Sequence, residues 1–303
     1  GGASASGGSY KVSVILKTLA AEYWQYVKSG AEDYASEHSD KVTVEVKGPS
    51  SETAFDEMQN MIETDLSSGT YDGIVISPLQ SDTAAQLVSG TKLPIVAIDT
   101  NFTAPEVKSF VGTGNEAAAK KGGEAAVEAA KAAGWTDIKC IEIAGVQGDQ
   151  TNTARMNGYK AGVEEAGGTF LSDEVQYADA TADRATTAME AIMQTHPEGI
   201  AIICANNDDM AMAAARAAQG HDAYKNTIFL GFNGDRAACE AILDGQMTMS
   251  VAQMAYEMGY KAVETMVQVL DGETVDEFVD SGSDVVTPDN AQERLDTLKT
   301  QLH

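Results

Sequence analysis

The stretch YKVSVILKTLAAEYWQYVKSG (residues 10–30) contains the pattern that decides the fold. An apolar, largely β-branched run over residues 10–16 ends at Lys17, and a helical pattern that includes Tyr23 and Trp24 begins a few residues later. Short continuous runs of this kind are typical of strands that are covered on both faces. The stretch therefore predicts a buried β-strand that leads into a helix, with a cation and two aromatic rings at the junction.

The same switch from strand to helix recurs along the chain. Strand-like runs occur at residues 10–16, 41–46, 73–77, 94–99, 107–112, 138–145, 198–205, 227–232 and 248–253. Helical patterns lie between them, at residues 53–66, 115–133, 152–166, 182–194, 208–219, 236–243 and 255–270. This alternation predicts the α/β class, with parallel sheets flanked by helices and right-handed crossover connections.

The composition excludes several classes of partner. The chain carries 46 acidic and 20 basic side chains, a formal net charge of −26, which argues against nucleic acid and anionic membranes because both attract basic surfaces. No apolar run reaches the roughly 18 residues of a membrane-spanning helix. The 303 residues, 43% of them hydrophobic, suffice for two domains with cores of their own. We expect a monomer that needs no metal or other cofactor.

The cysteines and the start of the chain carry no catalytic signal. Cys140, Cys204 and Cys239 lack metal-binding spacing and are predicted to be buried free thiols. The start, GGASASGGS (residues 1–9), predicts a flexible linker. Such a linker fits an engineered addition and also the mature end of an exported, lipid-anchored protein.

Polar and aromatic residues follow nearly every predicted strand. Ligands of parallel α/β sheets bind in the crevice outside the carboxyl ends of the strands, so residues at these ends form the candidate ligand site. The selected residues are Lys17, Tyr23, Trp24, Asp99, Arg155, Asn207, Asn233 and Gln253. Rings, charged groups and amides together suit a sugar, whose hydroxyls need donors and acceptors and whose C–H faces stack on aromatics. Ser77, Asn206 and Phe232 also stand at strand ends but are not selected.

Several of the selected residues have a purely structural alternative. Trp24 could belong to a core stripe, and Asp99 could be a turn residue or a helix cap. Asn207 could cap the helix that follows it, and Arg155 could form a surface ion pair. Gln253 is harder to explain by structure alone, because a buried amide needs hydrogen-bond partners.

Known catalytic patterns are missing from the sequence. The chain contains no GxSxG, HExxH or P-loop pattern, and GTGNEAA (residues 112–118) predicts a turn and a helix cap rather than a dinucleotide-binding loop. The four histidines fall in predicted helix ends, loops or the terminus and are expected to be solvated. We therefore expect a binding protein and not an enzyme.

Several segments resemble the periplasmic sugar-binding proteins of the ribose/allose-binding type, and most closely its allose-binding members. They are VILKTLAAEYWQYVKSG, DGIVISPLQSD, PIVAIDT, TARMNGY, CANNDDMAMAAARA, LGFNG and DGQMTMSVAQ. Together they span nearly the whole chain. The resemblance implies two Rossmann-like domains joined by three hinge crossovers, the type I periplasmic binding protein fold, which close on a sugar held in the cleft between them.

The resemblance also implies domain boundaries and residue roles. One sugar-binding subdomain is expected at residues 10–112 plus 254–282, and the other at residues 113–253 plus 283–303. Lys17 matches a hydrogen-bonding lysine of the family, and Tyr23 and Trp24 match the aromatic pair that packs on the sugar ring. The positions that match other ligand contacts are Asp99, Arg155, Asn207 and Gln253.

Two places depart from the family pattern. Asn233 stands where the family usually has Asp, so an amide replaces a charged acceptor. In YADATADR (residues 177–184), Thr181 or Ala182 stands where another ring usually lies, and Tyr177 is a candidate to replace that ring. The resemblance therefore indicates a monosaccharide ligand without identifying it as allose.

The leading interpretation is an extracytoplasmic solute-binding protein, periplasmic or lipid-anchored at the cell surface. It would deliver a neutral monosaccharide, a hexose pyranose, to the permease subunits of an ABC importer. The alternative is a sensor that presents a sugar, an inositol-like polyol or a furanosyl signal to a membrane receptor, and the sequence does not separate the two. The core of a LacI-type repressor, which shares this fold, is disfavoured because no helix-turn-helix precedes the first strand and the charge is acidic.

Overall fold

The computed structural model describes residues 9–302, which form two compact units. Within the described residues, unit 1 comprises 9–113, 254–282 and 300–302, and unit 2 comprises Gly114–Gln253 and Ser283–Lys299. The predicted linker, residues 1–9, lies outside the described residues except for Ser9. Each unit is built on its own sheet.

The sheet of unit 1 is parallel, with the strand order β12-β5-β4-β3-β1-β2. Its strands are β1 (Tyr10–Ile15), β2 (Val42–Lys47), β3 (Gly73–Ile76), β4 (Ile95–Ile98), β5 (Val107–Gly112) and β12 (Phe278–Asp280). Its helices are α1 (Glu22–Glu37), α2 (Phe55–Ser67), α3 (Ser81–Val88) and α9 (Ala255–Leu270).

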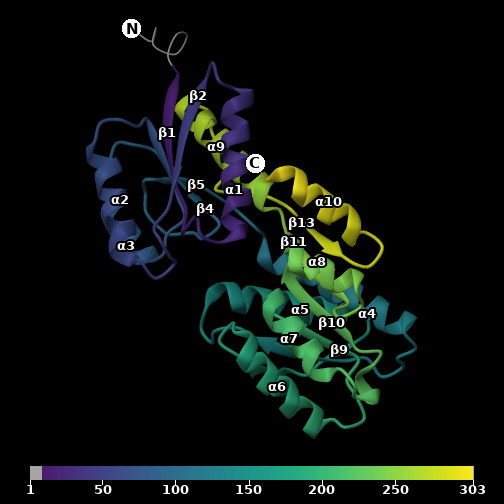
Figure 1. Cartoon of the computed structure of the whole chain (residues 1–303). Helices are drawn as coiled ribbons and strands as arrows, with labels where there is room; N and C mark the ends of the chain where they lie inside the picture. The colour runs from purple at the N-terminus through teal and green to yellow at the C-terminus, as the bar shows by residue number, and fades with distance from the viewer. Residues whose placement is uncertain (1–8, 303) are drawn as a thin grey trace. The chain divides into compact units, whose positions relative to one another are not determined.

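Helices cover both faces of this sheet (Figure 1). On one face, isoleucines of β3 and β4 pack against apolar residues of α2 and α3; they are Ile74, Ile76 and Ile95, with Ile62 and Val88 among the helix residues. On the other face α1 and α9 pack against each other so closely that a Cβ on Gly30 would lie 1.9 Å from the carbonyl oxygen of Tyr256. Only glycine permits this approach, which fixes α1, and with it Tyr23 and Trp24, against the sheet.

The sheet of unit 2 has the order β13-β11-β10-β9-β6-β7, with the short strand β8 also paired to β6. Its strands are β6 (Lys139–Ala144), β7 (Thr169–Phe170), β8 (Gln176–Tyr177), β9 (Ile202–Ala205), β10 (Ile228–Asn233), β11 (Met249–Gln253) and β13 (Ser283–Val286). Its helices are α4 (Asn115–Ala132), α5 (Gln150–Glu165), α6 (Ala182–Thr195), α7 (Asp208–Ala218), α8 (Arg236–Leu243) and α10 (Ala291–Gln301), with 3-10 turns η2 (Ser172–Glu174) and η3 (Asp222–Tyr224).

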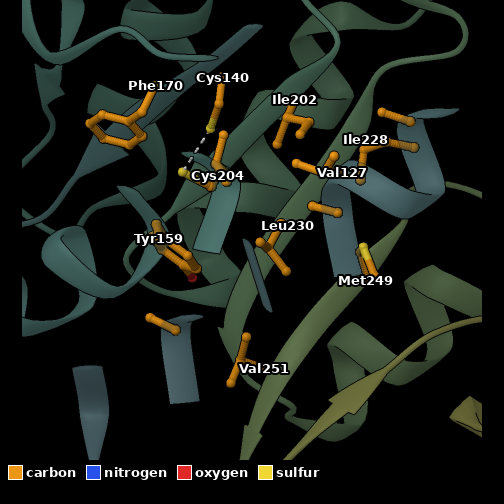
Figure 2. Packing of buried hydrophobic residues seen from close by; sticks show 14 of the residues in the cluster. Val127, Cys140, Tyr159, Phe170, Ile202, Cys204, Ile228, Leu230, Met249 and Val251 are labelled. Carbon is orange, nitrogen blue, oxygen red and sulfur yellow. Dashed lines mark hydrogen bonds between the residues drawn. The ribbon is translucent and has the colours of Figure 1, made fainter. Parts of the chain in front are cut away.

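The main core of unit 2 lies between this sheet and the helices α4 and α5. Figure 2 shows Val127 of α4 and Tyr159 of α5 in one cluster with strand residues such as Leu230. Cys140 and Cys204 belong to the same cluster, and their sulfur atoms lie 3.5 Å apart. Together with Cys239 they are buried free thiols, as predicted.

The predicted α/β alternation is confirmed, with a few corrections. The strand predicted over residues 198–205 begins only at Ile202, because Gly199 adopts a positive φ of 99° and turns the chain. The sheet of unit 2 is not purely parallel, since β13 runs antiparallel to β11. The prediction also missed the helices α3 and α10. It missed the short strands β7, β8, β12 and β13 because runs of two to four residues carry no usable periodicity.

Candidate functional site

Both sheets place the candidate residues at their carboxyl edges. In unit 1 the order reverses at β1, which has its successor β2 on one side and β3 on the other. In unit 2 it reverses at β6, between β7 and β9. Such switch points open a crevice at the carboxyl ends of the strands, where α/β sheets bind ligands.

In unit 1, Tyr23 and Asp99 are brought together. Tyr23 lies in the first turn of α1, and its hydroxyl donates a hydrogen bond of 2.6 Å to Oδ2 of Asp99, directly after β4. The Thr100 hydroxyl donates to Oδ1 of the same carboxylate at 3.0 Å. Two donors therefore orient the Asp99 carboxylate, which is half-buried and keeps lone pairs for further donors. The structural alternative also holds in part, since Asp99 is a turn residue with a φ of 64°.

Trp24 and Lys17 occupy different environments beside this pair. The side chain of Trp24 is only 4% exposed, and its ring meets the Tyr23 ring edge-on, with centroids 4.9 Å apart. Trp24 therefore packs inside unit 1 in this structure and supports the ring of Tyr23. Lys17 is half-buried one residue beyond the buried Leu16, near the end of β1.

In unit 2, Arg155 is not a surface residue, so its interpretation as a surface ion pair is wrong. It is 8% exposed, and its guanidinium lies 3.9 Å from the centroid of the Phe232 ring. Its Nε donates to Oδ1 of Asn115 and its Nη1 donates to the backbone oxygen of Asn206, both at 2.9 Å. The planar guanidinium suits this combination of stacking and directed donation. Asn115 and Phe232 are thus parts of the candidate site that the sequence analysis did not select.

Asn207 caps α7, as its structural alternative predicted. Its Oδ1 accepts a hydrogen bond of 2.8 Å from the backbone N–H of Met210, and its Nδ2 donates to the carbonyl of Ala180 at 3.2 Å. The cap explains why Asn stands here. The second bond ties the loop that follows β8 to the carboxyl end of β9.

Asn233 and Gln253 form an amide pair at the ends of β10 and β11. Nε2 of Gln253 donates to Oδ1 of Asn233 at 2.7 Å, and Gln253 is only 7% exposed. Next to Asn233 in the chain, the backbone N–H of Gly234 donates at 2.8 Å to the buried carboxylate of Asp208, which also accepts the Ser250 hydroxyl at 2.6 Å. Burial raises the pKa of Asp208. Asp208 holds the chain around Asn233 in place and was not selected from the sequence.

Backbone strain is concentrated at the same edges. Among residues 9–302, the non-glycine residues with a positive φ are Asp99, Asp179, Ala180 and Asn233. All of them lie at or just after the carboxyl end of a strand, namely β4, β8 or β10. Such conformations cost energy and cluster at functional sites, so their distribution independently marks these edges.

The loop after β8 contains the position where the family ring is missing. Thr181 caps α6 by accepting a hydrogen bond from the N–H of Arg184 at 3.4 Å and is exposed. Tyr177, at the end of β8, is 42% exposed. Its ring is therefore accessible in unit 2, and its role as a replacement ring stays a prediction.

Other charged groups of the described chain do not add a metal centre. No cluster of three or more His, Cys, Asp or Glu side chains among residues 9–302 could hold a metal ion, and no described helix is suited to cross a membrane. The prediction that His196 is solvated is wrong, because its side chain is 15% exposed. Its ring nitrogens lie 2.6 Å from Glu174 and 3.0 Å from Glu198, and these carboxylates, Glu174 first, raise its pKa.

Known proteins match this chain over most of its length. A family model described as a periplasmic binding protein domain matches residues 12–274. The D-allose-binding periplasmic protein of Escherichia coli is 30% identical over 265 residues, 84% of this chain and 83% of that protein. The ribose import binding protein of the same organism is 28% identical over 268 residues, 87% and 86% of the two chains. The two identities are similar, so the expected closest resemblance to allose-binding members is not supported.

Solved structures share the fold. The periplasmic ribose ABC transporter protein of Conexibacter woesei has a TM-score of 0.83, with 19% identity and 100% of both chains covered. A solute-binding protein of Bacillus halodurans with bound myo-inositol has a TM-score of 0.77, with 22% identity and 96% and 98% of the two chains covered. These similarities support the two-sheet α/β fold predicted from the sequence.

Proposed function

Because this chain belongs to the periplasmic binding protein family, whose members bind solutes and are not enzymes, we propose that it captures a neutral monosaccharide, a hexose in its pyranose form. Relatives named for ribose and allose cover more than four fifths of the chain and support this class of ligand. The family is extracytoplasmic, and its ribose-type members serve ABC importers. We extend that role to this chain: it delivers its sugar to the permease subunits of such an importer.

The observation that carries the proposal is the set of pre-oriented polar groups beside aromatic rings at both sheet edges. In unit 1 the Asp99 carboxylate is held at 2.6 Å by Tyr23. In unit 2 the Arg155 guanidinium rests on Phe232, and Gln253 is bonded to Asn233 at 2.7 Å. Donors and acceptors that are fixed before binding lose little entropy when a ligand hydroxyl replaces water.

The proposed site comprises the residues selected from the sequence. They are Lys17, Tyr23, Trp24 and Asp99 in unit 1, and Arg155, Asn207, Asn233 and Gln253 in unit 2. We assign the sugar-binding subdomains to these two units, with hinges where the chain passes from one to the other. A ligand that contacts both edges stabilises the closed state and shifts the population toward it. The permease would recognise that state.

The test is a thermal-shift screen followed by calorimetry. Pentoses, hexoses, their 6-phosphates and polyols, including D-ribose, D-allose and myo-inositol, are added singly to the purified protein. We expect one or a few neutral sugars to raise the melting temperature, with 1:1 binding in the calorimeter. The phosphates serve as matched anionic controls, and binding of a phosphate but not its parent sugar would contradict the neutral class. If no sugar or polyol stabilises the protein, the proposal fails.

We also propose that the protein is monomeric and extracytoplasmic, either in the periplasm or at the cell surface as a lipid-anchored protein. Size-exclusion chromatography with light scattering tests the monomer. Mass spectrometry of the protein from the membrane fraction of its source cells tests the anchor, since an unmodified, fully soluble protein would rule it out.

A further inference from the structure

Asn206 stands at the switch point of unit 2. It follows β9 directly, and its backbone N–H donates to the carbonyl of Ile143 in β6 at 3.2 Å. The successor of β6 along the chain, β7, lies on the opposite side of β6 from β9. Asn206 therefore lies where the crevice of a parallel sheet opens.

The Asn206 side chain is buried, but its acceptor is not used. The residue is 7% exposed, and its Oδ1 has no hydrogen-bond partner among the described residues. A buried acceptor without a partner destabilises the fold, and native proteins contain few of them. Such a group in a native protein calls for an explanation.

The surroundings hold this amide in place without satisfying its oxygen. The backbone oxygen of Asn206 accepts the 2.9 Å bond from Arg155. Asn152, a neighbouring amide that is 1% exposed, uses its Oδ1 to accept the N–H of Gly145 at 2.8 Å. A Cβ on Gly145 would lie 2.7 Å from Nδ2 of Asn206, so glycine leaves the space that the Asn206 amide occupies.

The same arrangement recurs in unit 1. Ser77 follows β3, the strand beside the switch point, and its N–H donates to the carbonyl of Ile15 in β1 at 2.8 Å. Ser77 is fully buried, and its Oγ has no partner among residues 9–302. Each sheet thus has, beside its switch point, one buried polar side-chain atom without a hydrogen-bond partner among residues 9–302.

We propose that Asn206 is a specificity-determining residue whose Oδ1 accepts a hydrogen bond from a hydroxyl of the ligand. This inference rests on the proposed function and deepens it. An acceptor beside Arg155 selects a ligand that donates from a hydroxyl at this point. It discriminates against an analogue that lacks that hydroxyl, because the acceptor would then stay unpaired.

The test compares Asn206→Leu, which removes the acceptor at similar volume, with Asn152→Leu, which removes a neighbouring acceptor that already has a partner. Melting temperatures are measured without sugar and with D-ribose, D-allose or myo-inositol, and Kd by calorimetry for each sugar that binds the wild type. We expect Asn206→Leu to melt at or above the wild-type temperature without sugar and to bind about 10- to 100-fold more weakly. Asn152→Leu should melt lower even without sugar.

A second variant covers the case in which Asn206→Leu does not fold. Gly145→Ala leaves Asn206 present but displaces its amide, and it should also weaken binding. If either folded variant binds the sugar with wild-type affinity, the inference about Asn206 is wrong, but the proposed function is unaffected. A lower melting temperature of unliganded Asn206→Leu with unchanged Kd assigns Asn206 a structural role and also overturns it. If no sugar binds the wild type, the inference falls together with the proposed function.

Discussion

Glu142 offers a quantitative test of how the core of unit 2 is built. It lies in β6, is fully buried, and its Oε2 has no partner among the described residues. Among residues 9–302, its other oxygen has only the weak thiol donor of Cys204, at 3.9 Å. Burial raises the pKa of Glu142 from 4.5 to about 8. The folded protein therefore keeps this carboxyl protonated at neutral pH, whereas the unfolded chain ionises it.

The sign of the effect follows from proton linkage. Because the folded pKa is the higher one, the stability associated with the protonated carboxyl is complete below pH 4.5 and is lost as the pH rises toward 8. Over that window unfolding releases a proton, so the free energy of unfolding falls by about 1.4 kcal/mol per pH unit. Glu142→Gln keeps the shape of the side chain and cannot ionise. The stability of the variant relative to the wild type should therefore rise by about 3–4 kcal/mol between pH 5 and pH 8.

Urea unfolding at pH 5, 6, 7 and 8 measures this difference. The chain has two tryptophans, and Trp135 belongs to unit 2, so a Trp24→Phe background makes the fluorescence report on the unit that holds Glu142. Other titrating groups are shared by both proteins and cancel in the difference. Glu190→Gln, at an exposed glutamate of the same unit, controls for the exchange of a carboxyl for an amide. Parallel pH profiles of Glu142→Gln and the wild type would refute the reasoning, since they would mean that Glu142 is ionised in the fold.

Three further effects are expected. Tyr23→Phe removes the 2.6 Å bond that orients Asp99 and should weaken sugar binding about tenfold in calorimetry; an unchanged Kd would remove this pair from the site. Arg155→Lys cannot keep both 2.9 Å donations and the contact with the ring and should lower the free energy of unfolding, measured by urea titration, by about 1–3 kcal/mol; a stability equal to the wild type would contradict its buried role. The pKa of His196 is raised, chiefly by its bond to Glu174, so the stabilisation by its imidazolium is complete below the unfolded pKa of 6.5 and disappears as the pH rises through the folded value. His196→Gln should accordingly lose stability relative to the wild type at pH 5.5 but much less at pH 8.5, and a deficit independent of pH would show that the ion pairs are not its source.

Much of the fold could be predicted because its signals are local. Continuous β-branched runs and helical periodicity are properties of neighbouring residues, and they located most strands and helices within a few residues. The antiparallel strand β13 and the three-residue β12 were missed, because such short strands exist only through pairing with residues far away in the chain. The buried thiols were predicted for the same local reason, as they lie in apolar runs.

The residue types and positions of the candidate site could be predicted, but the hydrogen-bond partners of these residues could not. The carboxyl-edge rule selected Tyr23, Asp99 and Gln253 from the sequence, yet nothing local indicated which of them would bond to which. Arg155 illustrates the limit. A helical arginine is usually solvated, but contacts such as those with Asn115 and Phe232 bury this one in the candidate site.

The sequence by itself determined the class of fold, the two-domain organisation expected for a chain of this length, and the strand ends at which the candidate site residues stand, because periodicity and chemical type are written residue by residue. Only the tertiary structure decided that Trp24 is buried with its ring edge-on to Tyr23, that His196 lies between two carboxylates, and that Ser77 and Asn206 each have a buried polar atom without a partner among the described residues. Burial and hydrogen-bond satisfaction depend on which distant segments meet, and that is settled when the sheets and helices pack.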